Sequence, residues 1–514
     1  MARLHDYHIL GTDELLAMIA TTKGYYSRDY SLWLGWNNMR YIIDAAFLQA
    51  KLLNRTLILP SFVYARTCEY DTAVCSEHAE MVSMGTALGM PHWNKVDAWR
   101  IPLPLMLNIT RMRAAHPVIL VADYLRLHDL PADFEAGNGE WDRVRYPAET
   151  LFVVENEAYD PRGTVRVDSL PDEVKARGNW TLNAKGVGGA WMHAEESAVS
   201  RHLRHYVRPS TSTADYDIAR NILKRTEFAE QYDLLSADGF AACLHENGWE
   251  ILHTFDMHRK TDMARTVVNP IRQVAQRTSL RSWTDDYGDV DTEVLVLVGE
   301  THSERKAGTM LFTTDVARKA FQRAVLQETL PNDAFLALAE TLAQRMSRLV
   351  QGRLWMGAHM RRGDFVSQGW AVDRSAEKHL WRVKAHLEKG RKDFDKIKDV
   401  QPYDVPDMVP NMDLVTLERP DIRDPFYLAT DERDPVVLKM FRDTGGVVLQ
   451  DLLTEADEKV IGWPLAFMAV RGVVEQSILA HSAFFTGSSL SSVAGGIVNM
   501  RAARGADWRT VFFS

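Results

Sequence analysis

The second half of the chain alternates between short apolar runs and longer amphipathic stretches, and this alternation constrains the fold more than any other feature. Four apolar runs predict buried strands, at 354–360, 425–429, 445–450 and 483–487. Three stretches predict helices, at 374–389, at 464–482 and from Ser491 onward. Strands that alternate with helices form a parallel sheet with helices on both faces. We therefore predict a doubly wound α/β domain in this half.

An earlier part of the chain predicts a second unit of the same kind. Residues 37–54 place apolar side chains on one helical face, and the short run at 56–60 follows as a buried strand. The run at 293–300 predicts another strand, and 332–352 a helix with Asn332 as its N-cap. A chain of 514 residues is too long for a single core. We therefore divide it into an extension at 1–30, a first domain at 31–330 and a second domain at 331–514, with a charged, proline-bearing surface insertion near 391–413.

Charge and composition exclude several classes of protein. The formal net charge is −9, whereas a nucleic-acid binder carries a basic surplus. We find no apolar stretch of membrane-spanning length and no signal-peptide pattern. We expect a protein of the secretory pathway if an N-terminal anchor precedes this sequence, and a cytoplasmic protein otherwise. Cys68 and Cys75 are close enough to pair, which would leave Cys243 over, but the sequence leaves this pairing open.

Polar side chains follow three of the predicted strands, and ligands bind beyond the carboxyl ends of parallel strands. Arg361 can bind a phosphate through two charged hydrogen bonds. The helix that begins near Ser491 offers backbone N–H groups and the positive end of its dipole. Asp431 is an acceptor that suits the N–H donors of a guanine edge. The sequence thus predicts a diphosphate site, with candidates His359, Arg361, Asp431, Ser488, Ser491 and Ser492.

Four stretches resemble the protein O-fucosyltransferases and their plant and fungal relatives. Residues 34–60 are similar to the family's Gly-x-x-Asn-x-x-Arg loop and following helix, and 359–365 to its His-x-Arg-Arg-x-Asp-Phe motif. Residues 426–434 resemble its strand ending in Ala-Thr-Asp, and 483–501 its Gly-Thr-x-x-Ser-Ser/Thr-Phe segment. The four stretches occur in the family's order. The resemblance implies a GT-B fold, in which two Rossmann-like domains face an interdomain cleft.

The resemblance also implies an activity and roles for residues. The activity would be inverting, metal-independent transfer of fucose from GDP-fucose to a hydroxyl acceptor, Ser or Thr of a protein or else a glycan, with no cofactor. Arg361 would contact the β-phosphate, Ser491 and Ser492 the phosphate oxygens, and His359 and Asp431 the nucleotide. Ser488 and Val493 of the same segment would also bind the nucleotide or its phosphates. The N-terminal loop would face the sugar and the acceptor, through Gly35, Trp36, Asn37, Asn38 and Arg40. The catalytic candidates are Arg361, Asn37, Asn38 and Asp364.

The chain departs from the family at two positions, which leaves alternatives open. Leu34 stands where some members carry a catalytic glutamate, so the base is unassigned; Asp364 and Asp29 are the candidates. Asp364 is more readily explained as an ion pair or cap beside Arg361, and Val493 replaces an aromatic residue. The open alternatives are an enzyme of the same fold that uses another sugar nucleotide, and an inactive homologue that binds a nucleotide or a partner.

Two short motifs suggest other functions, and both are disfavoured. The Asp-x-Asp motifs at 289–291 and 393–395 match metal-dependent glycosyltransferases, but we expect them on solvated loops. Arg362-Gly363-Asp364 spells a cell-adhesion tripeptide, yet it abuts a predicted buried strand rather than an exposed loop tip.

Overall fold

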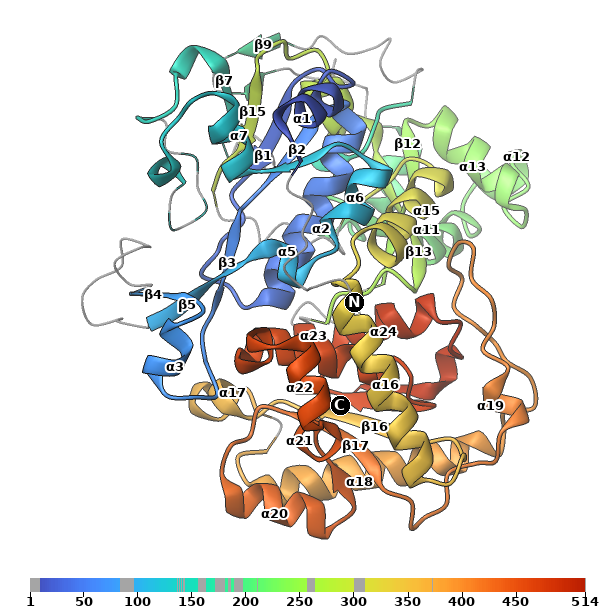
Figure 1. Ribbon diagram of the computed structural model, residues 1–514. Coiled ribbons are helices and arrows are strands. Elements are labelled where there is room, and N and C mark those ends of the chain that lie inside the picture. The colour runs from blue at the N-terminus through green and yellow to red at the C-terminus, as the bar shows by residue number, and fades with distance from the viewer. Residues whose placement is uncertain are drawn as a thin grey trace.

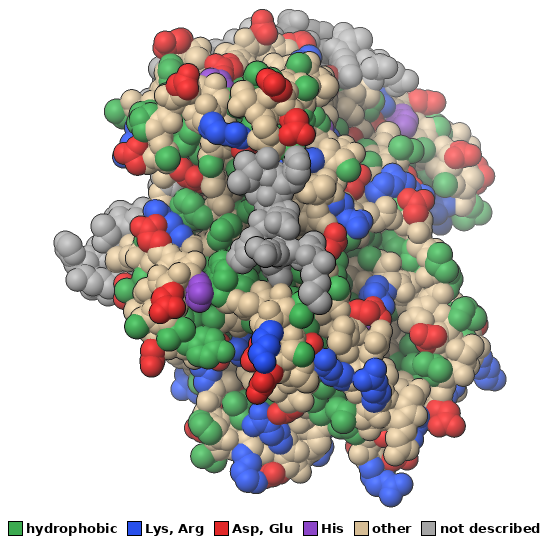
Figure 2. Space-filling model, viewed as in Figure 1, with side chains coloured by type: hydrophobic (Ala, Val, Ile, Leu, Met, Phe, Trp, Pro, Cys, Tyr) green, Lys and Arg blue, Asp and Glu red, His purple; other side chains and the backbone are tan. Residues whose placement is uncertain are grey.

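The chain folds into two α/β domains, one formed mainly by its first 330 residues and the other by the rest (Figure 1). On the face in Figure 2, acidic and basic side chains are interspersed. The computed structural model describes residues 10–83, 97–135, 137, 139, 141, 144–155, 163–171, 181–183, 186–188, 197–209, 211–256, 264–299, 310–371 and 373–513, except for the side chains of Ala148, Asp364, 181–183 and 186–188.

The second domain contains a five-stranded sheet in the order β18-β17-β16-β19-β20, with all pairs parallel. Its strands are β16 (Met356–Met360), β17 (Phe426–Thr430), β18 (Gly446–Val447), β19 (Phe484–Gly487) and β20 (Val511–Phe513). Its main helices are α16 (Asp333–Leu349), α17 (Gly363–Gln368), α18 (Ala376–Phe394), α20 (Pro435–Asp443), α22 (Glu455–Ile461), α23 (Met468–Leu479) and α24 (Ser492–Ala503).

This sheet confirms the predicted doubly wound domain, with small differences at its edges. The third predicted strand is short because Asp451 accepts the backbone N–H of Val448 (3.0 Å) and starts the helix α21 (Leu449–Leu452). The helix predicted at 464–482 begins only at Met468, after a 3-10 turn. Helix α18 continues to Phe394, so the segment predicted as an insertion begins in a helix. The strand β20 was not predicted.

The first domain contains a second five-stranded parallel sheet, in the order β6-β2-β1-β15-β7. Its strands are β1 (Tyr25–Arg28), β2 (Thr56–Leu59), β6 (Val118–Leu120), β7 (Leu151–Val154) and β15 (Val294–Leu297). The predicted helix and strands at 37–60 and 293–300 are confirmed, with α2 running over Trp36–Leu53. The central strand β1 lies within residues 1–30, which the sequence analysis assigned to an extension.

Two antiparallel units are inserted into the first domain, and the sequence did not predict them. The first contains β3 (Phe62–Ala65), β4 (Glu80–Ser83), β5 (Asp97–Pro102) and the short helix α3 (Thr72–Ser76). A disulfide joins Cys68 to Cys75 in this unit. The second contains β11 (Ala214–Asp215), β12 (Trp249–Phe255) and β13 (Pro270–Gln276), and packs with α11 (Tyr216–Leu223) and α13 (Ala237–Glu246) around its own apolar cluster, which includes the free thiol of Cys243.

The two domains are in close contact. One apolar cluster contains buried side chains of both, including Phe47 of α2 and Val474 of α23. A backbone bridge also crosses between them, because Glu69 donates its N–H to Ala466 (2.8 Å) and Met468 donates to Thr67 (3.1 Å). The chain therefore has the predicted α/β class, with two Rossmann-like domains. No helix in the described part of the chain is long and apolar enough to cross a membrane.

Candidate functional site

Three of the predicted polar strand ends meet at one edge of the second sheet. The strand β16 is central, with β17 on one side and β19 on the other. Ala358 pairs with Leu428 of β17 and Thr486 of β19, so the three strands end side by side. His359, Arg361, Asp431 and the serines after Gly487 are thereby brought together, as the sequence predicted.

Arg361 and Asp431 form an ion pair at this edge. The Nη1 of Arg361 lies 2.9 Å from Oδ2 of Asp431, and the other oxygen of Asp431 accepts the N–H of Arg362 (2.7 Å). Arg361 is 31% exposed, whereas Asp431 is 11% exposed. Gly363 allows this approach, because a Cβ atom there would lie 2.4 Å from Asp431 Oδ2. Asp431 thus holds Arg361, whose side chain stays partly exposed. The contact of Asp431 with a nucleotide stays a prediction.

Arg362 has a different environment from its neighbour. It is buried, and its guanidinium donates to Glu432 (2.8 Å) and to the carbonyl of Arg374 (3.0 Å). These contacts fix the loop that follows β16. The Arg-Gly-Asp tripeptide therefore begins with a buried arginine that already has partners, which is not the exposed loop tip that adhesion needs.

His359 carries a buried nitrogen without a hydrogen-bond partner among the described residues. Its side chain is 7% exposed, and its Nδ1 has no partner there. Burial, the nearby Arg361 and His379 together lower the pKa of His359 to about 3, so the ring is neutral at ordinary pH. Side chains alternate along a strand, so His359 lies on the same face as Gly357, which packs against Leu479 of α23. A neutral imidazole on this face can bind a nucleotide through either ring nitrogen.

The helix α24 begins directly after the third strand end. Ser491 is its N-cap residue, yet its hydroxyl makes no capping hydrogen bond. The first N–H groups of a helix lack intrahelical partners, so this terminus attracts anions. Ser491 is buried and Ser492 partly exposed, while the hydroxyl of Ser488 accepts the N–H of Leu490 (3.3 Å). Val493 packs against the shared apolar cluster.

The residues predicted as an N-terminal loop, Gly35 to Arg40, begin helix α2 instead, and this helix lies against α24. The hydroxyl of Tyr41 donates to the carbonyl of Ser492 (2.9 Å). The Oδ1 of Asn37 lies 3.6 Å from where a Cβ atom on Gly496 would stand. Asn38 has a buried Oδ1 with no partner among the described residues. The start of α2, with Gly35 as N-cap and Trp36 as its first residue, thus faces α24.

Arg40 lies in the same part of α2, but its side chain contacts other residues of the first domain. Its guanidinium donates to the carbonyl of Thr329, and its Nε lies 3.5 Å from Asp44. Asp44 is fully buried, and burial raises its pKa despite Arg40. Arg40 therefore fixes α2 against residues 324–329. A contact with sugar or acceptor stays a prediction for Arg40.

Sequence reasoning missed two charged residues at this site. Glu475 of α23 is partly exposed, and burial raises its pKa to about 8, with Asp431 adding to the shift and a backbone hydrogen bond from Thr430 opposing it. The available signal was that Glu475 is the single acid of this mainly apolar helix. Arg265 is buried between the domains, where its N–H donates to Tyr41 (3.1 Å) and its carbonyl accepts from Asn499 (3.3 Å). No pattern in the sequence singled it out.

The remaining candidates lie apart from these contacts. Leu34 is 8% exposed and packs in the apolar cluster, so this position supplies no base. Asp29 is buried and accepts the N–H of Ser31 (2.8 Å). Asp364 lies in α17, and its side chain falls outside the described residues.

The two Asp-x-Asp motifs do not form metal clusters. Asp289 and Asp291 are exposed, and Asp393 pairs with Lys396 (2.6 Å) near the end of α18. Among the described residues, no group of three or more His, Cys, Asp or Glu side chains could hold a metal ion.

Comparisons with known proteins give structural neighbours only. No family model matches the chain, and no curated protein matches it. A crystal structure of POFUT1 in complex with GDP-fucose is 10% identical, covers 96% of this chain and 98% of its own, and has a TM-score of 0.35. POFUT1 in complex with GDP gives the same values. The NodZ α-1,6-fucosyltransferase soaked with GDP-fucose is 13% identical, covers 41% of this chain and 53% of its own, and has a TM-score of 0.23.

Proposed function

We propose that this protein is an inverting glycosyltransferase that moves fucose from GDP-fucose to a hydroxyl acceptor. The observation that carries the proposal is the meeting of Arg361, the unpartnered His359 and the uncapped start of α24 at one sheet edge, facing the N-terminal loop of the other domain. This edge offers cationic and N–H groups for a diphosphate, and the facing loop offers amides for a sugar and its acceptor.

The chemistry requires charge compensation on the leaving group. As the bond to the sugar breaks, negative charge grows on the departing diphosphate, and fixed donors can stabilise it. Arg361 and the backbone N–H groups at the start of α24 supply such donors, with the Ser491 hydroxyl beside them. We propose that no divalent metal ion is needed. Asn37 and Asn38 then hold the sugar and the acceptor hydroxyl on the opposite side, as inversion requires.

Glu475 and His359 suit the nucleotide base. Guanine presents two neighbouring N–H donors on one edge, and a carboxylate accepts both. Both oxygens of Asp431 already have partners, whereas Glu475 is partly exposed at the same edge. We therefore assign guanine recognition to Glu475 in addition to the predicted Asp431. A nucleotide that supplies donors to Glu475 favours its ionised form, so binding releases a proton at neutral pH.

Other observations support fucose as the donor sugar, a protein as the acceptor and the secretory pathway as the location. Fucose and a Ser or Thr acceptor follow from the four stretches that resemble the O-fucosyltransferases. The disulfide between Cys68 and Cys75 supports an oxidising compartment, since disulfides persist in secretory proteins and are rare in the cytosol.

The first test is calorimetric binding of GDP, UDP, ADP and GMP, with and without Mg²⁺, to the wild type and to Arg361→Ala. We expect a preference for GDP that does not depend on Mg²⁺ and that Arg361→Ala removes. Preference for UDP would instead favour another sugar nucleotide as donor. No binding of any nucleotide would overturn the catalytic assignment.

One second candidate is favoured by a specific observation. Leu34 is buried where some relatives carry a catalytic glutamate, so an inactive homologue that only binds nucleotide is the alternative. Release of GDP from GDP-fucose in the presence of acceptor separates the two, because only an enzyme turns the donor over.

A further inference from the structure

One buried hydroxyl of the first domain holds the helix turn that begins α24. The hydroxyl of Tyr41 donates to the carbonyl of Ser492 (2.9 Å), the first residue of α24, and accepts the backbone N–H of Arg265 (3.1 Å). A tyrosine hydroxyl has a single O–H to donate, so this group uses its donor and an acceptor position at once. Helix α2 is thereby joined both to α24 and to the segment that contains Arg265.

That segment forms a strap along α24, made by residues 264–268 between the strands β12 and β13. At one end, the N–H of Ala264 donates to the carbonyl of Ser489 (2.9 Å), just before α24. Farther along, the side-chain amide of Asn499 in α24 donates to the carbonyl of Arg265 (3.3 Å). Since the strap belongs to the first domain, these bonds also fix α24 relative to that domain.

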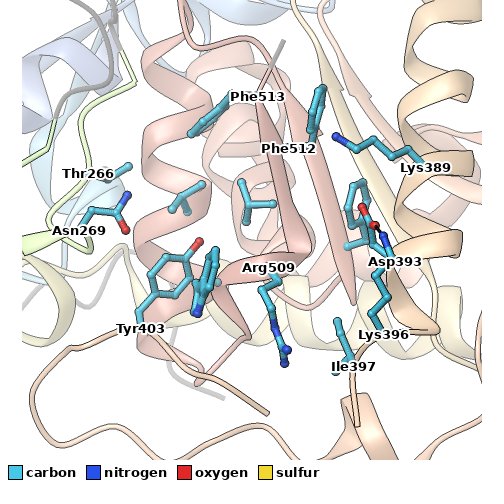
Figure 3. A pocket seen from close by; sticks show the side chains of 14 residues that line it. Thr266, Asn269, Lys389, Asp393, Lys396, Ile397, Tyr403, Arg509, Phe512 and Phe513 are labelled. Carbon is cyan, nitrogen blue, oxygen red and sulfur yellow. Dashed lines mark hydrogen bonds and ion pairs between the residues drawn. The ribbon is translucent and has the colours of Figure 1, made fainter. Parts of the chain in front are cut away.

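One side of the strap borders a cavity, so packing does not enclose it there. The cavity has a volume of about 450 Å³ and lies beside the edge strand β20, with Thr266 of the strap and Val498 of α24 in its lining. Figure 3 shows Thr266 and Asn269 on one wall of this cavity, with Lys389 on the other. If the strap lost a hydrogen bond, this space would allow it to shift.

Two glycines allow α24 to lie this close to the first domain and to α23. A Cβ atom on Gly495 would lie 2.5 Å from the hydroxyl oxygen of Tyr41 and 2.5 Å from the backbone nitrogen of Arg265. A Cβ atom on Gly496 would lie 2.4 Å from Oε1 of Gln476. These distances are shorter than a Cβ atom can tolerate, so a side chain at Gly495 would separate α24 from Tyr41.

We propose that Tyr41 is a positioning residue, which fixes the first turn of α24 relative to the start of α2. The inference rests on the proposed function, in which that turn holds the diphosphate of the donor while Asn37 and Asn38 hold its sugar. Asn37 precedes Tyr41 by about one helical turn, so both belong to the same rigid stretch of α2. A shift of α24 against α2 would keep the diphosphate contacts and misplace the sugar against these amides.

The test compares the affinities of GDP and GDP-fucose by calorimetry, in the wild type and in Tyr41→Phe. This change keeps the buried ring and removes the hydroxyl. We expect GDP to bind within about twofold of the wild type and GDP-fucose at least about fivefold more weakly, because loss of one hydrogen bond has effects of this size. The ratio of the two dissociation constants is decisive, since a change in stability alone would not alter it.

Tyr64→Phe in β3 is the matched control. Tyr64 and Tyr41 are both 6% exposed, and the hydroxyl of Tyr64 donates to the carbonyl of Gly137 (2.6 Å) away from α24. This variant loses a comparable hydrogen bond, yet it should keep both affinities within about twofold of the wild type. Equal weakening of GDP-fucose in the two variants would overturn the proposal.

Gly495→Ala perturbs the same contact from the other side. The added methyl group should push α24 from Tyr41, so GDP-fucose should again be weakened more than GDP. In the double variant with Tyr41→Phe, the hydroxyl that this methyl group would meet is absent. The two losses should therefore combine to less than their product, as expected for residues in contact. Losses that multiply in full would contradict the proposed role of the hydroxyl.

The remaining outcomes separate this inference from the proposed function. If the wild type binds both ligands and Tyr41→Phe leaves the ratio of their dissociation constants unchanged, the inference alone is wrong. Equal weakening of GDP and GDP-fucose would also overturn it, because Tyr41 would then support the second domain as a whole. A wild type that binds neither GDP nor GDP-fucose would overturn the proposed function and this inference with it.

Discussion

The two parallel sheets share the order of their first three strands and differ in the order of the last two, and their carboxyl ends are built differently. At the first sheet, polar groups at the strand ends contact side chains of the same domain, although Arg28 Nε and Ser31 Oγ lack a hydrogen-bond partner among the described residues. The Nη1 of Arg28 donates to Gln49 (2.9 Å), and the indole of Trp141 donates to Ser27 (2.6 Å). Trp141 also packs on Tyr146, with ring centroids 4.2 Å apart. At the second sheet, Arg361 remains 31% exposed and His359 keeps an unpartnered nitrogen.

Because both sheets leave a buried polar atom without a partner among the described residues, the exposed charge of Arg361 is what favours the second sheet as the predicted ligand site. A buried polar atom without a partner costs about 1–3 kcal/mol. A native protein tolerates this cost where a ligand or water completes the hydrogen bonds. The first sheet therefore supports the start of α2, from Gly35 to Arg40. The second sheet presents the charged groups, so changes at its end should reduce function more than equivalent changes in the first.

The largest expected effect is that of Arg361→Ala. We expect turnover to fall about 100- to 1,000-fold, since loss of one preorganised donor to a developing charge has effects of this size. The free energy of unfolding should change by less than about 1 kcal/mol, because the ion pair with Asp431 is partly exposed. Turnover assays and thermal unfolding measure the two quantities. Arg442→Ala, which breaks the exposed pair with Asp451, is the control and should keep full activity.

Two results would contradict the role of Arg361. A variant that fails to fold would make Arg361 a structural residue, like Arg362. A variant that folds and turns over at the wild-type rate would show that Arg361 has no role in the reaction.

The next effect is a pH dependence of GDP binding that depends on Glu475. Its pKa is about 8 when the site is empty, so the carboxyl is mostly neutral at pH 6. Binding that requires the ionised form should strengthen by up to about tenfold per pH unit until pH 8 and then level off. Calorimetry across this range should show the slope in the wild type and its loss in Glu475→Gln. A wild type whose affinity does not change between pH 6 and 8 would exclude this role.

Glu135 of the first domain provides the matched control for Glu475. Burial raises its pKa too, and it accepts the N–H of Ser61 (2.7 Å). Glu135→Gln should leave the pH dependence of GDP binding intact. The raised pKa of Glu475 also affects stability with a definite sign. The folded state holds a proton that the unfolded state has lost, so this group lowers stability as pH rises from about 4.5 to 8.

The sequence predicted the second domain better than the first for a physical reason. In the second domain, strands that follow one another in the chain mostly pair with each other. The spacing of apolar residues and the ends of these strands could therefore be predicted from short segments of sequence. In the first, Leu297 of β15 pairs with both Arg28 and Val154, across long insertions that form separate units. Residues that act through such contacts, as Arg265 does beside Tyr41, carry no local signal. Arg361, by contrast, follows its strand directly and was predicted.

A smaller effect is expected from Asn38→Ala. The buried Oδ1 of Asn38 has no partner in the described structure, so its removal should leave stability unchanged or slightly raised. Turnover should fall about 10- to 100-fold if this amide positions the sugar or acceptor. GDP affinity should not change. Asn332→Ala is the control: it removes a helix cap and should cost about 1 kcal/mol of stability without loss of turnover. Loss of stability in Asn38→Ala with normal turnover would make it structural.

The smallest functional effect should follow loss of the Cys68–Cys75 disulfide, because that bond lies in the first domain. It closes a loop with a sequence separation of 7, and its removal should lower the free energy of unfolding by about 2–3 kcal/mol. Glu69 in this loop pairs with Arg433 (2.9 Å) and Arg471 (3.4 Å), but its backbone bond to Ala466 remains without the disulfide. Denaturant unfolding and GDP binding of Cys68→Ser with Cys75→Ser measure both effects. If GDP binding were lost while the variant stayed folded, the nucleotide site would depend on the first domain. The contrast between a supporting first sheet and a ligand-binding second sheet would then be wrong.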